Sequence, residues 1–176
     1  MPDYLIQSTA QFWPELTLAL TFIAAMIFEF VTKKRTTGTG ILVLLGLAAA
    51  LVQLPFSPAQ PVAIFSGMYA IDAFSIFFKY LIIITAMVVV LFSFQSAELK
   101  KEAAHTGEFY CFIAVLTLGM VLMTGASNLL MIYLTIEIVS IASYILAGFS
   151  KSLRRSGEAA LKYVIFGGMS SGVMLY

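Results

Sequence analysis

Six long apolar blocks, separated by short polar segments, constrain this chain more than any other feature of its sequence. A helix of about 20 apolar residues is long enough to cross the roughly 30 Å hydrocarbon layer of a bilayer. In hydrocarbon the backbone must satisfy its own hydrogen bonds, which favours α-helices for such blocks. The sequence therefore predicts an all-α, polytopic transmembrane helix bundle, a single membrane domain over residues 1–176. Its expected spans are approximately 15–32, 40–54, 70–94, 109–125, 128–149 and 158–176.

The composition agrees with a lipid-embedded protein and argues against several other classes. Hydrophobic residues make up 61% of the chain and charged residues only 11%, whereas a soluble domain carries about 25% charge. The net charge of +1 gives no reason to expect binding to nucleic acid. The first twelve residues contain no Lys or Arg ahead of the first apolar block. We therefore expect that block to be a retained anchor in contact with the lipid bilayer, and not a secretory signal peptide.

The chain has few residues that could hold a redox cofactor or a metal. Its single cysteine, Cys111, lies inside an apolar block, and its single histidine, His105, lies in a polar segment. One cysteine forms no intrachain disulfide and cannot supply the four ligands of an iron–sulfur cluster. No phosphate-binding glycine loop or nucleophile–base motif is visible. We expect no bound cofactor, no metal and no catalytic centre in this chain.

Basic residues occur in alternate connections between the blocks. The connections over 55–69 and 125–128 carry no Lys or Arg. Cytoplasmic loops carry an excess of Lys and Arg, so the alternation predicts an N-terminus outside and basic loops in the cytoplasm, in what we expect to be a bacterial inner membrane. The basic residues that follow the first, third and fifth blocks are Lys33, Lys34, Arg35, Lys100, Lys101, Lys151, Arg154 and Arg155.

Glu137 is an ionisable residue near the middle of the fifth block. A carboxylate at that depth costs roughly 2.5–3.5 kcal/mol on insertion scales and usually serves proton or ion handling. With Tyr133, Ser140 and Tyr144 it forms one polar stripe at helical spacing. Such a stripe can hold the water chain that proton hopping needs. The alternative is a glutamate that only hydrogen-bonds to neighbouring helices, a task that Gln or Ser would do at lower cost.

Lys162, one turn inside the sixth block, is the candidate partner of Glu137, and two interpretations of it stay open. Glu158 precedes it by four residues, so the two side chains could form a pair at the membrane surface. Alternatively, Lys162 is about 6 Å deep and Glu137 about 18 Å deep from the cytoplasmic edge, at 1.5 Å per residue. The lysine side chain and one or two waters would bridge that interval and couple the lysine to the proton affinity of the carboxylate.

The other charged residues of the apolar blocks have simpler interpretations. Lys79 shares a helix face with Asp72 and is either a second buried cation or, slightly favoured, a side chain that reaches back to the outer surface. Glu15, after a Trp-Pro pair, and Glu29 are interpreted as residues at the two membrane surfaces. Asp72 and Asn128 have the side chains and positions expected of helix N-caps. Gly168 and Gly172 have the spacing of a close helix contact.

Four stretches of the sequence resemble the antiporter-like subunit family of respiratory complex I, NADH-quinone oxidoreductase. Within that family the stretch over 158–167 favours the subunit N group over subunits L and M and Mrp-type antiporters. The first two blocks are similar mainly in hydropathy. The matching stretches are DAFSIFFK (72–79), NLLMIYLTIE (128–137), SYILAG (143–148) and EAALKYVIFG (158–167).

The resemblance implies a fold, a function, site residues and partners for this chain. It implies that the chain is the N-terminal part of a longer antiporter-like fold of about fourteen helices. Glu137 and Lys162 match residues of the family's fifth and sixth helices, and the glutamate is proposed to take part in proton translocation. The implied function is a proton-translocating, non-redox subunit of the translocase. The other membrane subunits of complex I would be its partners, and NADH or another donor, FMN, iron–sulfur clusters and quinone would be bound elsewhere in the complex.

Two other functions compete with this interpretation. An Mrp-type cation/proton antiporter would work without quinone reduction and would depend on Na⁺ or K⁺. A purely structural membrane subunit would tolerate the loss of the Glu137 carboxylate. In the proton-translocating interpretation, the residues expected to support Glu137 and Lys162 are Tyr133, Ser140, Tyr144, Lys79 and Glu158.

Overall fold

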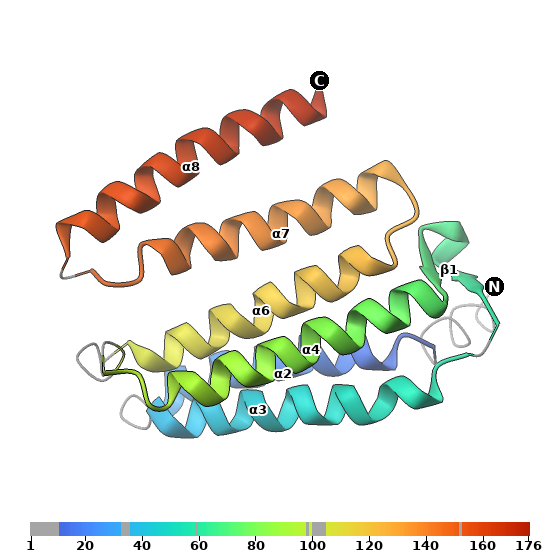
Figure 1. The fold of residues 1–176 in the computed structure, drawn as a ribbon, viewed down its shortest axis with the longest axis horizontal. Coiled ribbons are helices and arrows are strands. Elements are labelled where there is room, and N and C mark those ends of the chain that lie inside the picture. Colours follow the sequence, from blue (N-terminus) through green and yellow to red (C-terminus); the bar gives the residue numbers. More distant parts are fainter. Residues whose placement is uncertain (1–10, 33–35, 59, 98, 100–104, 152) are drawn as a thin grey trace.

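The computed structural model describes residues 11–32, 36–58, 60–97, 99, 105–151 and 153–176, and long helices dominate it (Figure 1). The long helices are α2 (Trp13–Thr32), α3 (Thr36–Gln53), α4 (Ala73–Ser93), α6 (Thr106–Thr124), α7 (Leu129–Ala147) and α8 (Arg154–Leu175). In the described residues, five helical segments have the length and apolar composition to cross a membrane. They are α2, α4, α6, α7 and the segment Thr37–Phe56, which includes residues 37–53 of α3. The polytopic all-α prediction is confirmed. The sixth expected span is helical as α8, and its crossing of the membrane stays a prediction.

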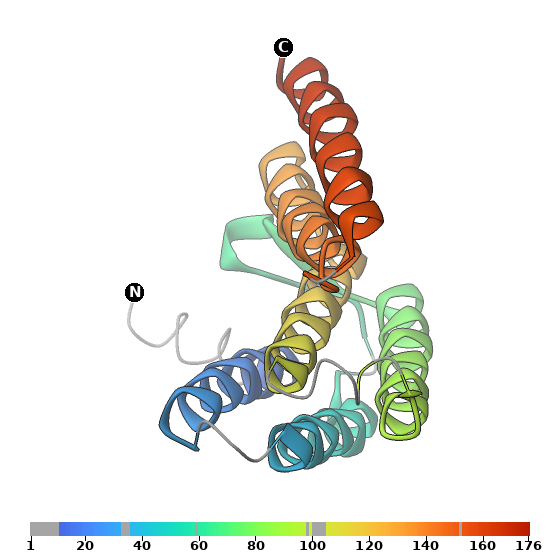
Figure 2. The same cartoon turned by 90° about the vertical axis from the view of Figure 1, so that its left-hand side faces the viewer.

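Helix α6 lies at the centre of the bundle. It packs against α2, α3 and α4 on one side and against α7 on the other, and α8 contacts α7 (Figure 2). The main core forms where α2, α3, α4 and α6 meet. Its members are fully or almost fully buried apolar side chains that interdigitate without polar partners, including Leu18, Val43, Leu47, Ile83, Val90 and Val121. Helices α7 and α8 therefore extend away from a four-helix core.

Local capping sets the starts of two helices. Asp72 Oδ1 accepts a hydrogen bond from Ser75 N at 2.7 Å, and Ser75 Oγ accepts one from Asp72 N at 3.0 Å, which completes a capping box for α4. Asn128 Oδ1 accepts from Met131 N at 2.8 Å and caps α7. Both N-cap predictions are confirmed. Helix α3 ends at Gln53, because Pro55 cannot continue the helical hydrogen bonds.

A β-hairpin lies between α3 and α4, where the sequence predicted a plain extended loop and the start of a helix. A short 3₁₀ turn, η1 (Leu54–Phe56), precedes it; the strands are β1 (Val62–Ile64) and β2 (Tyr69–Ile71), joined through the 3₁₀ turn η2 (Phe65–Gly67). The strands pair antiparallel, with Ile64 opposite Tyr69. The expected span that began at residue 70 is therefore wrong at its start, since α4 begins only at Ala73.

The hairpin is hydrogen-bonded to the turn between α6 and α7. Tyr69 and Ala126 form a β-bridge, in which Ala70 N donates to Gly125 O at 2.8 Å and Ser127 N donates to Met68 O at 3.0 Å. A Cβ atom at Gly125 would collide with the Tyr69 ring, so the close approach requires glycine at this turn. The start of α7 is thus fixed to the hairpin (Figure 1).

Helix α8 contacts α7 through a face other than the one the small-residue spacing predicted. A Cβ atom at Gly167 would collide with the Tyr144 hydroxyl, and one at Gly148 would come within 2.8 Å of Ala160 Cβ, whereas Gly168 and Gly172 have nothing within 4 Å in the described chain. The glycine that allows the close contact is therefore Gly167. No α8 residue is buried by the described part of the chain.

We expect Gly119→Ala to destabilise the contact between α6 and α7. Its Cβ atom would lie 2.9 Å from Cγ2 of both Ile138 and Val139, the two residues that follow Glu137. Overpacking of this kind costs about 1–3 kcal/mol of unfolding free energy. Denaturation of the purified protein in mixed micelles measures it, with Gly157→Ala, which meets no atom within 4 Å in the described chain, as the control. Equal stability of both variants would contradict the packing.

Candidate functional site

Glu137 is the ninth of the 19 residues of α7, near the middle of the helix, and its depth in a membrane stays a prediction. It is about 12 Å from the start of the helix at 1.5 Å per residue. The residue is half-buried, and its Oε2 atom is buried without a hydrogen-bond partner among the described residues. A buried carboxylate oxygen without a donor is costly, so we expect a water or a further donor to bind at this atom.

The polar stripe of α7 contacts α8 at the C-terminal end of α7, through Tyr144. Tyr144 stacks edge-on against Tyr163 of α8, with ring centroids 4.8 Å apart, and rests on Gly167. Ser143, beside the stripe, donates a hydrogen bond to the Tyr163 hydroxyl at 3.3 Å. The next turn of α8 toward Glu137 carries small hydroxyl side chains, Ser170 and Ser171. The hydroxyls that the structure places at the α7–α8 contact are those of Ser143, Tyr144 and Tyr163, and the roles of Tyr133 and Ser140 stay predictions.

The structure does not bring Lys162 to Glu137, because the neighbouring Tyr163 packs against Tyr144, about two helical turns from the carboxylate. Helix α8 begins at Arg154, four residues before the predicted start, so Lys162 lies about 12 Å along it. The side chain is exposed and makes no ion pair with any described residue. The contact face of α8 carries Ala160, Tyr163 and Gly167, which turns Lys162 to a different side of the helix. A role for Lys162 beside Glu137 stays a prediction.

Glu158 pairs with a different residue from the one expected. Its Oε1 atom lies 3.4 Å from Arg154 Nε, one helical turn earlier, and both side chains are exposed. An exposed pair of this kind is worth little stability, about 0.3–0.5 kcal/mol. The predicted surface pair between Glu158 and Lys162 is absent in the described structure.

Of the two interpretations of Lys79, the buried cation is confirmed, and the favoured one, a side chain that reaches back to the outer surface, is wrong. Lys79 Nζ lies 2.5 Å from Glu15 Oε1, and their side chains are 1% and 0% exposed. Lys79 is about 9 Å into α4, and the pair joins this helix to Glu15 in the first turn of α2. Helical spacing relates Lys79 only to residues on its own helix and therefore did not predict the pair. An acidic and a basic residue in separate apolar blocks were the signal that would have found it.

Tyr69 completes a buried polar cluster with this ion pair. Its hydroxyl donates to Glu15 Oε1 at 2.7 Å, and Lys79 Nζ lies 5.3 Å from the centroid of its ring. Burial, and then the neighbouring Glu15 charge, raise the pKa of Tyr69 far above its ordinary value. The phenol therefore stays protonated and acts as a donor. Glu15 Oε2 and Gln11 Oε1, four residues apart, are buried acceptors without partners among the described residues.

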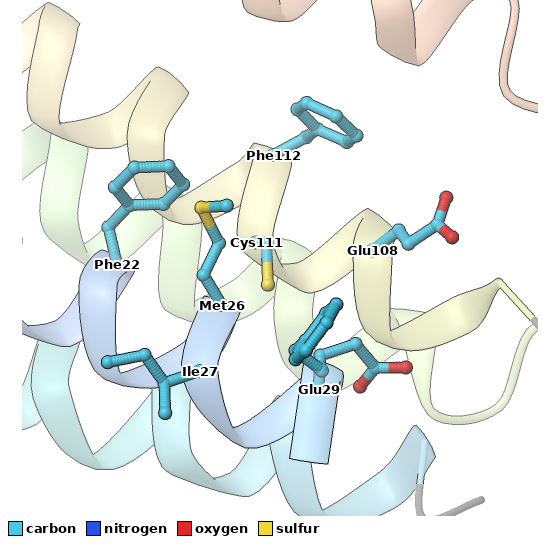
Figure 3. Close-up of a pocket in the computed structure, with 8 residues that line it drawn as sticks. Phe22, Met26, Ile27, Glu29, Glu108, Cys111 and Phe112 are labelled. Carbon is cyan, nitrogen blue, oxygen red and sulfur yellow. The ribbon is translucent and has the colours of Figure 1, made fainter. Parts of the chain in front are cut away.

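A hollow of about 610 Å³ lies between α2 and α6, well away from Glu137 (Figure 3). Its walls are apolar, with Phe22, Met26 and Phe112, and the Cys111 thiol faces it. Glu29 and Glu108 lie at one end. Glu29 accepts a hydrogen bond from Thr39 Oγ1 at 2.5 Å.

Glu108, at the start of α6, lies close to two residues that can carry positive charge. Glu108 contacts His105 Nδ1 at 3.1 Å and Lys151 Nζ at 3.7 Å. Lys151 and Arg154 lie in the described connection to α8, whereas the basic residues at 33–35 and 100–101 lie outside the described residues. No group of three or more His, Cys, Asp or Glu side chains suitable for a metal occurs in the described part of the chain. The arrangement offers proton exchange and ion pairing as its chemistry.

Comparisons with known proteins agree with this geometry. A family model described as "NADH:quinone oxidoreductase/Mrp antiporter, TM" matches residues 126–176, which include Glu137 and all of α8. NADH-quinone oxidoreductase subunit N of Chlorobium chlorochromatii is 39% identical over 171 residues, which cover 96% of this chain and 33% of that protein. Subunit N 2 of Chloroherpeton thalassium is 42% identical over 169 residues, 94% of this chain and 33% of that protein.

The fold is similar to part of a solved respiratory complex. A chain of "Respiratory complex I from Thermus thermophilus with bound Aureothin" superposes with a TM-score of 0.76 and 29% identity, covering 93% of this chain and 35% of that one. Five helices long and apolar enough to cross a membrane, together with the family match over residues 126–176, indicate a multi-pass membrane protein. The chain is similar over most of its length to NADH-quinone oxidoreductase subunit N. It spans about a third of the length of the curated relatives that it matches.

Proposed function

We propose that the protein is a proton-translocating membrane subunit of an NADH-quinone oxidoreductase, in which Glu137 takes up and releases a proton. The observation that carries the proposal is the carboxylate at the middle of α7, with a buried oxygen that lacks a donor among the described residues. The hydroxyls of the α7–α8 contact would hold the waters that deliver the proton. Lys162 would tune the proton affinity of Glu137 once other helices complete its surroundings.

The chain has a supporting and non-redox role in this proposal. Electron transfer from NADH or another donor through FMN and iron–sulfur clusters to quinone would take place in other subunits. The free energy it releases would reach Glu137 through changes in the charge of neighbouring groups. The work is substantial, since moving one charge across 100 mV takes about 2.3 kcal/mol. The partners would be the other membrane subunits and the surrounding lipid.

The complete complex in sealed vesicles tests this function against its main alternative. We expect acidification driven by NADH oxidation to persist when Na⁺ and K⁺ are replaced by choline, and to stop when a quinone-site inhibitor is added. An Mrp-type cation/proton antiporter would show the opposite pattern. Proton movement that needs Na⁺ or K⁺ and ignores the inhibitor would contradict the proposal.

We also propose that the connection between α7 and α8 faces the cytoplasm and the hairpin faces outward. Basic residues gather on cytoplasmic loops, and Lys151, Arg154 and Arg155 all lie in or beside this connection. In a Cys111→Ala background, Lys151→Cys should react with an impermeant maleimide only in inside-out vesicles. Met68→Cys, in the hairpin, should react only in right-side-out vesicles. The reverse pattern, read as a mass shift of this subunit, would contradict the orientation.

A further inference from the structure

The cluster of Glu15, Lys79 and Tyr69 has a cost that simple packing does not explain. Both charged side chains are removed from water, and replacing a buried ion pair by apolar residues of similar size is often neutral or stabilising. Ionisable residues inside membrane helices are rare and usually functional. The cluster is distinct from Glu137, which lies on another helix.

Tyr69 connects this cluster to α7. Its hydroxyl binds Glu15, while its backbone pairs with Ala126 in the turn that leads into α7. The two flanking hydrogen bonds, from Ala70 N to Gly125 O and from Ser127 N to Met68 O, measure 2.8 and 3.0 Å. One residue therefore links the charged pair of α2 and α4 to the segment just before the α7 N-cap.

The connection acts at the turn before α7. Helix α7 also packs against α6, where Gly119 lies against Ile138 and Val139, although only its Thr135 and Ala142 are buried in the described chain. Glu137 is about 12 Å along the helix from Leu129. A shift of the hairpin that moved this turn would therefore also move the carboxylate.

We propose that Glu15, Lys79 and Tyr69 are positioning residues that hold α7, and with it Glu137, at the depth required for proton exchange. The charged pair fixes Tyr69, and Tyr69 fixes the turn. The inference rests on the proposed function of Glu137. It assigns to the cluster a mechanical role and no proton of its own.

The titratable groups around α7 allow the effect to be isolated. The test changes Tyr69 alone and leaves every charge and every group beside Glu137 in place. The other titratable groups on α7 and on the two helices packed against it are Tyr133 and Tyr144 on α7, Glu108, Tyr110 and Cys111 on α6, and Arg154, Arg155, Glu158, Lys162, Tyr163 and Tyr176 on or at the end of α8.

The decisive variant is Tyr69→Phe in the complete complex, with Tyr80→Phe as its matched control. Phenylalanine keeps the ring against Gly125 and removes only the hydroxyl that binds Glu15, whereas Tyr80 has no hydrogen bond among the described residues. We expect Tyr69→Phe to move the pH of half-maximal proton pumping by at least about half a unit, a threefold change in proton affinity. Tyr80→Phe should leave it unchanged.

The outcomes separate this inference from the function on which it rests. If the Tyr69→Phe profile coincides with that of the unsubstituted complex while Glu137→Gln has lost pumping, the positioning role is wrong and the proposed function stands. A shift of equal size in Tyr80→Phe would also refute it, because the effect would then be unspecific. If Glu137→Gln pumps at the full rate, the proposed function itself fails.

Discussion

Replacing Lys79 by methionine is expected to lower the free energy of unfolding by about 3–5 kcal/mol, because it leaves the Glu15 carboxylate buried without its counter-charge. The pair is 1% and 0% exposed, so water does not compensate for the loss. The Tyr69 hydroxyl, at 2.7 Å, satisfies only part of the remaining charge. Denaturation of the purified protein in mixed micelles measures the change.

The double variant Glu15→Gln/Lys79→Met distinguishes a lost charge balance from lost packing. It removes both charges, keeps side chains of similar size and leaves an amide oxygen to accept from Tyr69. Most of the stability lost in Lys79→Met should therefore return. A double variant as unstable as the single one would show that the ion pair is not the source of the effect.

Glu137→Gln is expected to lower proton pumping by the complete complex by at least about tenfold, since positioned proton-transfer groups typically contribute a hundredfold or more. Glutamine has nearly the same shape and keeps an oxygen acceptor, but it cannot carry the proton. Pumping in sealed vesicles, measured together with quinone reduction, checks the result.

Glu158→Gln is the control for this experiment. Glu158 is exposed and pairs only with the exposed Arg154, so its loss should leave pumping within the error of the assay. A purely structural subunit would instead give near-normal pumping in both variants, provided that the complex assembles. That outcome would remove Glu137 from the proton path.

Features that depend on neighbours in the sequence were predictable. Apolar blocks gave the helices, and the Asp72 and Asn128 side chains gave two helix starts, because capping acts within one turn. The position of Glu137 near the middle of a helix follows from its place in its own apolar block. These predictions needed only periodicity and a constant rise per residue.

Features that depend on the pairing of distant segments were not predictable in the same way. Each strand of the hairpin has three residues, too few to show an alternating pattern. The Glu15–Lys79 pair joins separate helices, and Lys162 turns away from α7 because Gly167 and Tyr163 decide which face of α8 makes contact. Rotation of a helix about its axis is set by packing, which one sequence does not show.

The central claim is that Glu137 gains and loses a proton during turnover. Infrared difference spectroscopy of the complete complex, between its oxidised and NADH-reduced states, measures this directly. The account predicts a carboxylic acid C=O band that changes between the two states, disappears in Glu137→Gln and persists in Glu158→Gln. Identical difference spectra for Glu137→Gln and the unsubstituted complex would contradict it.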